Sequence, residues 1–184
     1  MEIIIGIVIL ALLVLVFVYN GLISKKNEVE NSLSGIEVQL TKRYDLIPNL
    51  VSSVQKYMEH EKEVLTELTE LRAKALNSSR GSNEEIELNN KISQGLARVV
   101  LSAENYPDLK SSDNFIQLQR SLNEVEEQLA AARRGFNSAV TSYNNGLEMF
   151  PSNVIANYLG LQRKELFQAP DVKRSDITVK DLFS

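Results

Sequence analysis

Apolar residues are distributed unevenly along this sequence. Residues 3–18 carry no polar side chain at all. From Val29 onward, apolar residues return at intervals of three and four, the spacing that places them on one face of a helix. The pattern predicts one uniformly apolar helix followed by a series of amphipathic helices.

The apolar N-terminal segment has the properties of a membrane anchor. A helix over residues 3–18 is about 24 Å long, and Leu22 and Ile23 extend it toward the roughly 30 Å of a bilayer core. A signal peptide would need a basic segment before the apolar run and small residues at a cleavage site, which are missing. A core helix would carry a polar face. We therefore expect a transmembrane anchor over residues 1–23.

The charges that flank this anchor predict its orientation. Lys25 and Lys26 follow the apolar run, whereas Glu2 offsets the α-amine at the other end. Positively charged flanks remain on the cytoplasmic side. We expect a single-pass protein of the cell membrane, with a short N-terminus outside and the C-terminal domain in the cytoplasm.

The remaining chain predicts four helices and no strands. A heptad-like stripe of apolar residues predicts one helix from Val29 to about Leu76, kinked where Pro48 removes an N–H group. The fold class is therefore all-α: an N-terminal transmembrane helix followed by an elongated antiparallel bundle of about four helices. The other predicted helices span about 84–103, 113–150 and 153–167, within a bundle domain over 24–167 that precedes a C-terminal tail over 168–184.

The predicted helix lengths leave part of the first helix without a partner. The first helix after the anchor would be roughly 80 Å long and the third roughly 55 Å. On the order of 25 Å next to the membrane would then be uncovered, although it continues the apolar stripe. Either the C-terminal tail folds back over this stretch, or it forms a homo-oligomeric coiled coil or a partner-binding groove. The stripe residues there are Val29, Leu33, Ile36 and Leu40.

Arg43 is a charged residue on the apolar stripe. A charge in that position must be paired or reach solvent. Glu124, Glu127 and Asp108 are candidate partners, and the sequence does not choose among them. An enzyme would have to use a cluster of Arg43, Asp45 and Asp108.

A second polar patch lies late in the third predicted helix. Asn137, Tyr143 and Asn144 belong to a stretch rich in uncharged polar residues. Facing inward they would form a hydrogen-bond network that fixes the helix register, and facing outward they would form a docking patch.

Composition excludes several kinds of chemistry. The chain has no cysteine and a single histidine, so it offers no thiolate site and no histidine pair for zinc. Its glycines form no phosphate-binding loop. The net charge of −4 gives no basic field for nucleic acid. We expect no enzymatic activity, no cofactor, no metal, no nucleic acid and no small-molecule substrate.

Several motifs resemble those of the LemA family, a bacterial family. They include Gln39-Leu-Thr-Lys-Arg-Tyr-Asp-Leu-Ile-Pro-Asn-Leu-Val51, Glu104-Asn-Tyr-Pro-Asp-Leu-Lys110 and Phe150-Pro-Ser-Asn153. The resemblance covers residues 19–167 and implies a membrane protein with a helical cytoplasmic domain, but no defined activity.

These observations lead to two hypotheses on function. The first is a non-enzymatic scaffold that associates with itself or with a protein partner through helical surfaces beside the bilayer. The alternative is a signalling adaptor or a regulator of a membrane enzyme such as a metalloprotease. The interaction residues proposed for them are Val29, Leu33, Ile36, Leu40, Arg43, Asp45, Asn137, Tyr143 and Asn144.

Overall fold

The structure is a computed structural model that describes residues 1–58 and 60–167. Within these residues every regular element is helical, which confirms the all-α class. The predicted tail over 168–184 lies outside the described residues. The elements are α1 (Glu2–Val54), α2 (Lys62–Asn77), α3 (Asn83–Ser102), the 3-10 turn η1 (Ala103–Asn105), α4 (Pro107–Lys110), α5 (Asp113–Glu148) and α6 (Ser152–Tyr158).

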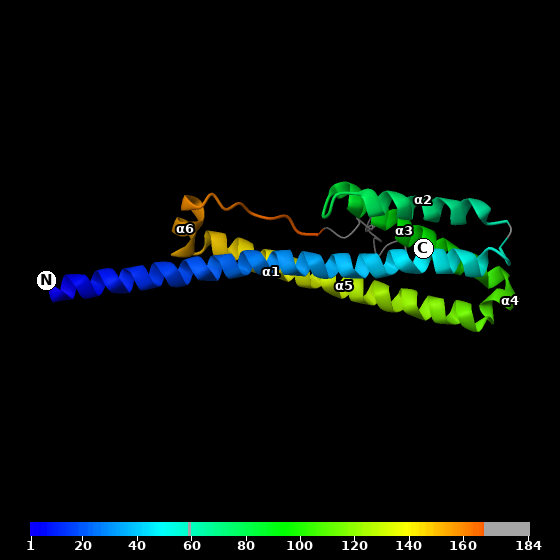
Figure 1. Cartoon of the computed structure of the whole chain (residues 1–184), viewed down its shortest axis with the longest axis horizontal. Helices are drawn as coiled ribbons and strands as arrows, with labels where there is room; N and C mark the ends of the chain where they lie inside the picture. Colours follow the sequence, from blue (N-terminus) through cyan, green and yellow to red (C-terminus); the bar gives the residue numbers. More distant parts are fainter. Residues whose placement is uncertain (59, 168–184) are drawn as a thin grey trace, which may run out of the picture.

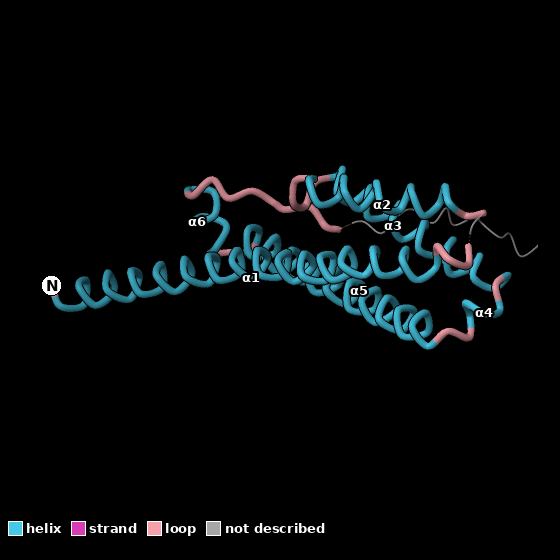
Figure 2. Tube along the Cα trace, turned by 45° about the vertical axis from the view of Figure 1, so that its right-hand side comes forward, coloured by secondary structure: helices cyan, strands magenta, loops and turns pink. Residues whose placement is uncertain are grey.

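The long helices α1 and α5 run antiparallel and form the axis of the molecule (Figure 1). The α2–α3 hairpin packs along the C-terminal half of α1, and α6 lies against α1 at the opposite end of the bundle. The N-terminal part of α1 projects beyond α6 in both views (Figures 1 and 2). In this projecting part nearly every side chain is exposed, and burial begins at Leu22.

One register holds α1 and α5 together over their whole contact. Near the anchor, a Cβ atom added to Gly146 would lie 3.4 Å from the Leu22 side chain. Towards the other end, Arg43 bonds to Glu126. The step from Leu22 to Arg43 is 21 residues on α1 and the step from Gly146 to Glu126 is 20 on α5, so the pairing does not slip. Glycine at 146 permits this approach, because its added Cβ would also lie only 3.2 Å from the Lys25 side chain.

The prediction of a continuous helix to Leu76 is wrong. The first helix ends at Val54, and α2 returns along it. Buried Met58 lies in the turn between them. Residues 55–61 contain neither glycine nor proline, and Leu68 remains buried after the reversal. The spacing of apolar residues therefore continues through the turn, and no turn-forming residue in the sequence reveals where the chain reverses.

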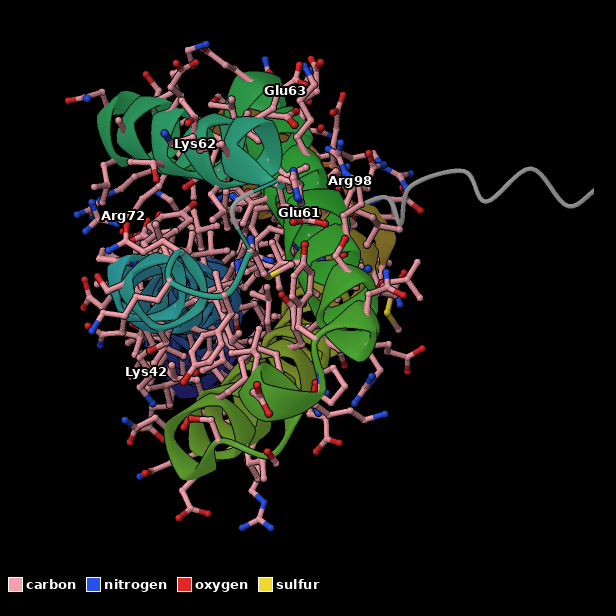
Figure 3. All side chains as sticks on the ribbon, turned by 90° about the vertical axis from the view of Figure 1, so that its right-hand side faces the viewer. Lys42, Glu61, Lys62, Glu63, Arg72 and Arg98 are labelled. Atoms are coloured by element: carbon pink, nitrogen blue, oxygen red, sulfur yellow. The ribbon has the colours of Figure 1, made fainter. Side chains whose placement is uncertain are left out.

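Pro48 does not end α1, because another helix compensates for its missing N–H group. The carbonyl of Tyr44 lacks its usual helical donor where residue 48 is proline. Nε of Arg72 donates to that carbonyl oxygen at 2.7 Å. Figure 3 shows Arg72 between α2 and α1 in the end-on view.

The predicted fourth helix is too long. α6 ends at Tyr158, and Gly160 then has a φ of +62°, a left-handed conformation that favours glycine. Residues 161–167 form a non-helical segment that runs back along the bundle (Figure 1). We call this segment the strap.

The apolar stripe next to the predicted anchor is covered, contrary to the expectation that it lacks a partner within the predicted helices. Val29 and Ile36 are each 1 % exposed and Leu40 is 3 % exposed, while Leu33 is half-buried. The length mismatch disappears because the folded-back α2 takes the residues that were assigned to the first helix. From Leu22 to Val54, α1 is about 48 Å long, close to the roughly 54 Å of α5.

Candidate functional site

Arg43 is fully buried and reaches from α1 to both α3 and α5. Its Nη1 donates to Ser93 Oγ at 2.9 Å and to Glu126 Oε1 at 2.7 Å, and its Nη2 donates to Asn89 Oδ1. The side chain is 0 % exposed, so these bonds replace the water that an ionised guanidinium needs. Arg43 therefore ties three helices together at one point.

The predicted partners of Arg43 are wrong, although the prediction of pairing is right. Glu126 supplies the carboxylate, whereas Glu124 and Glu127 are exposed. Neighbouring positions on a helix point about 100° apart, so one residue of shift decides which carboxylate faces α1. Asp45 and Asp108 are both exposed, and Arg43 is paired elsewhere, so the structure does not assemble the catalytic cluster considered above.

Asn89 fixes the arrangement around Arg43. Its Oδ1 accepts a second hydrogen bond, from Tyr44 OH at 2.8 Å, and its Nδ2 donates to Glu85 O at 2.9 Å. The bond from Nδ2 sets the orientation of the amide, so that its oxygen faces both donors. Burial raises the pKa of Tyr44 above its ordinary value, which keeps the phenol protonated as a donor.

Arg133 lies near this cluster on α5. Its guanidinium lies 5.5 Å from the ring centre of Phe167 in the strap. Burial, together with the positive charge of Arg43, lowers the pKa of Arg133 from its usual range. The carboxylate of Glu126 acts in the opposite direction, so it offsets part of the repulsion between the two arginines.

An open groove of about 540 Å³ lies between α3 and α5, directly beside the Arg43 cluster. Ser93 and Glu126, which bond to Arg43, line the groove. Along this side it runs from Ser93 on α3 to Glu104 in η1, which is about 16 Å of helix. Its apolar lining residues are Leu96, Ala97, Val100, Leu101 and Leu122.

The ionisable groups of the groove are all acidic. Glu104 and Glu126 are its charged lining residues, and Gln119, Asn123 and Ser93 are its uncharged polar ones. The Glu126 side chain is 40 % exposed, so its carboxylate remains accessible although Arg43 binds it. The groove thus combines an apolar surface with negative charge.

A larger hollow of about 710 Å³ lies under the turn from α1 to α2, lined in part by Val51, Met58 and Leu65. Lys62 is its charged lining residue. We place the candidate site in the α3–α5 groove, because an exposed leucine, Leu101 at 68 %, lines it together with two glutamates.

Asn137 and Asn144 face inward and hold the strap. Asn144 accepts from Lys164 N at 3.0 Å and donates to Lys164 O at 2.9 Å. Asn137 makes the same pair of bonds with Phe167, at 2.8 and 3.0 Å. Seven residues of α5 rise about 10 Å, which matches three residues of nearly extended chain. The spacing of the two amides along α5 therefore equals the spacing of the two strap residues whose backbone groups they bind.

Tyr143 lies beside these asparagines but contributes to the core. It is 2 % exposed, and burial raises its pKa above the ordinary value. Of the two interpretations of this polar patch, the inward one is correct, but its asparagines hold the C-terminal segment and do not bond to one another.

The groove residues were missed by the sequence analysis. Val100 and Leu101 lie beside the buried stripe of α3, which includes Leu96 and Val99. Two adjacent apolar residues outside a stripe widen the apolar face of a helix beyond what one neighbouring helix covers. This wider apolar face was the sequence feature from which an exposed groove on α3 could have been predicted.

Comparison with known proteins connects this fold to one family. The model of the LemA family matches residues 32–180. Protein LemA of Metamycoplasma hominis is 29 % identical over 170 residues, which cover 90 % of this chain and 78 % of the relative. Magnetosome protein MamQ 2 of Paramagnetospirillum magneticum is 23 % identical over 190 residues, covering 90 % and 70 %. Magnetosome protein MamQ of Magnetospirillum gryphiswaldense is 20 % identical with the same coverage.

Proposed function

The chain belongs to the LemA family, and from this premise we propose that it is a non-enzymatic, membrane-anchored scaffold. Its α3–α5 groove docks an amphipathic helix of a protein partner. The observation that carries the proposal is the exposed apolar lining of the groove, with Leu101 68 % exposed between two glutamates.

The lining of the groove defines the chemistry of its partner. Its length of about 16 Å fits roughly eleven residues of helix, or three turns. Small Ala97 leaves room for a large apolar side chain, and Glu104 and Glu126 favour lysine or arginine at the edges of that face. The partner helix is therefore apolar on one face and basic beside it.

The anchor places this groove near a membrane. α1 is the helix, among the described residues, that is long and apolar enough to cross a bilayer, with a mean hydropathy of 3.0 and none of the apolar window buried. Lys25 and Lys26 favour a cytoplasmic position for the bundle. The partner would then be a cytosolic protein or the cytoplasmic part of another membrane protein.

The orientation is tested with one cysteine, because the chain has none of its own. Ser79 is exposed in the loop between α2 and α3, so Ser79→Cys provides an accessible thiol. A membrane-impermeant maleimide should label it only after lysis. Labelling in intact cells would place the groove on the outer side of the membrane.

The docking is tested by site-specific photocrosslinking in cells. A photoreactive residue at Leu101 should crosslink to a helix with an apolar face flanked by basic residues, identified by mass spectrometry of the linked peptide. Val38, 53 % exposed on α1 and absent from the groove lining, is the matched control. Ala97→Glu should abolish the crosslink from Leu101, because its larger, charged side chain fills the space that small Ala97 leaves for an apolar residue of the partner.

Two outcomes would contradict the proposal. Equal crosslinking from Leu101 and Val38 would show that the groove has no specific partner. A crosslink from Leu101 to a second copy of this chain would show that the groove mediates self-association and does not bind a different protein.

A further inference from the structure

We propose that the turn between α5 and α6 inserts into the interface of the same bilayer that α1 crosses, and thus forms a second membrane contact. The turn and α6 expose four large apolar side chains, which we call the apolar cap. Phe150 is 82 % exposed, Tyr158 90 %, Met149 62 % and Val154 61 %.

The cap residues on α6 share one face of that helix. Val154 and Tyr158 are four residues apart, which places them one above the other. Ala156, 1 % exposed, is on the side that packs against the bundle. α6 therefore packs Ala156 and, in part, Ile155 against the bundle and leaves Val154 and Tyr158 outward, which an aqueous surface does not favour.

The register between α1 and α5 places the cap at the end of the apolar run. Gly146 lies against Leu22. Four residues beyond Gly146 is Phe150, and four residues before Leu22 is Val18, the last residue of the run 3–18. α5 ends at Glu148, which this register places opposite Asn20, and Phe150 follows two residues later in the turn, close to the level of Val18. The views show α1 projecting past α6 from this region (Figures 1 and 2).

This level is where a membrane-spanning helix passes from hydrocarbon to headgroups. Tyr19, on α1, lies at the same height. Aromatic side chains favour this zone, and Phe150 and Tyr158 make up half of the cap. Glu148, the nearest carboxylate along the chain, is paired with Arg163, which reduces its repulsion from anionic lipids.

A second contact would fix how the bundle stands on the membrane. A single helix permits rotation and tilt, whereas an anchor and an adjacent cap resist both. The part of α5 that lines the groove lies opposite about residues 42–49 of α1, roughly 40 Å beyond Val18. The cap would hold the groove at that distance from the bilayer, whether or not a partner binds there.

The experiment measures the depth of single spin labels in the full-length chain, reconstituted at one copy per lipid nanodisc. Phe150→Cys and Tyr158→Cys carry the labels, and Leu101→Cys, also exposed at 68 %, is the matched control in the groove. We expect the labels on the cap to be readily accessible to oxygen, which dissolves in the bilayer. Their collision rate with a water-soluble nickel complex should be at least fivefold lower than that of the Leu101 label. Circular dichroism of each variant checks that the bundle is folded.

Equal nickel accessibility at Phe150 and Leu101 would overturn the inference and place the cap in water. Protection that appears only in discs with two copies would also overturn it, because a second chain would then cover the cap. Neither result bears on the groove, since the crosslinking experiment reads a different surface.

Discussion

The α1–α5 pair is covered in two different ways along its length. In the half nearer the apolar N-terminal segment, the strap covers it through backbone bonds to Asn137 and Asn144. In the far half, the α2–α3 hairpin covers it, joined through the side-chain cluster of Arg43. The hairpin reaches α1 as far as Leu33, where a Cβ atom added to Gly81 in the hairpin loop would lie 3.8 Å from the leucine side chain.

The comparison shows that similar apolar stripes accept different partners. Val29 and Ile36 in one half and Ile47 in the other are almost fully buried, although a single segment covers the first and two helices cover the second. Polar residues make the distinction. In the first half, the Asn137 and Asn144 amides, two helical turns apart, bond to backbone groups of the strap. In the second half, the Arg43 guanidinium bonds to a carboxylate on one helix and an amide on another.

The segment that covers each half of the α1–α5 pair also determines whether a groove remains beside it. The strap packs Leu161 and Phe167 against the core. The hairpin contacts α1 mainly through α2, so α3 stands apart from α5 and leaves the groove between them. The proposed docking site is therefore a consequence of how the far half is covered.

Replacing Arg43 should have the largest effect on stability. Arg43→Ala removes a fully buried side chain and leaves Glu126 and Ser93 without the donor that Arg43 supplies, so we expect a loss of about 3 kcal/mol. Thermal unfolding followed by circular dichroism measures it. Arg43→Met combined with Glu126→Gln keeps the volume without an unpaired charge and should cost less. An equal cost for both would show that the loss of the hydrogen bonds and the ion pair accounts for the whole effect, and would contradict a separate cost of lost volume and an unpaired charge.

Replacing Asn144 should release the strap without affecting the far half. Asn144→Ala removes two hydrogen bonds, which contribute about 2 kcal/mol together, so the Lys164 amide should exchange with solvent roughly 30-fold faster. Thr141→Ala, exposed on the same helix, is the control. Faster exchange around Asn89 as well would contradict the independence of the two halves.

Arg72 should matter only because residue 48 is proline. Arg72→Ala removes the donor to the Tyr44 carbonyl and should cost about 1 kcal/mol. In a Pro48→Ala background that carbonyl regains its helical donor, so the same replacement should cost less. A double-mutant cycle of unfolding free energies measures the difference. Additive effects would show that the two residues act independently.

The smallest effect is expected in alkaline titration. Burial raises the pKa of Tyr44 and Tyr143 above 10.0, so the folded chain keeps protons that the unfolded chain releases. Stability should therefore decline as the pH rises above about 10. Phenolate absorbance should show two late-ionising tyrosines among the six in the chain. Tyr44→Phe should remove one of them, and unchanged late ionisation would place the raised pKa elsewhere.

Much of the fold was predictable because it depends on local signals. Ser82 caps α3 by accepting from Glu85 N, as the loop composition before that helix suggested, and Ser112 precedes α5. The turn after Val54 and the end of α6 were missed. The first has no glycine or proline, and the second depends on Gly160 alone.

The candidate site was less predictable, because it depends on which elements meet. The sequence indicated that Arg43 must be paired or reach solvent, and that Asn137 and Asn144 belong to a polar patch facing inward or outward. It did not indicate that Glu126 is the partner or that the strap is what the asparagines hold. Both facts require knowing that α2 folds back and that α6 is short.

The sequence by itself determined the all-α class, the apolar run 3–18 and the family, since composition and spacing are local properties of the chain. The tertiary structure decided the register of α1 against α5, the covering of the apolar stripe, and the separation of α3 from α5. The physical reason is that an apolar stripe specifies that it must be buried, whereas the element that buries it is chosen by contacts between residues far apart in the chain.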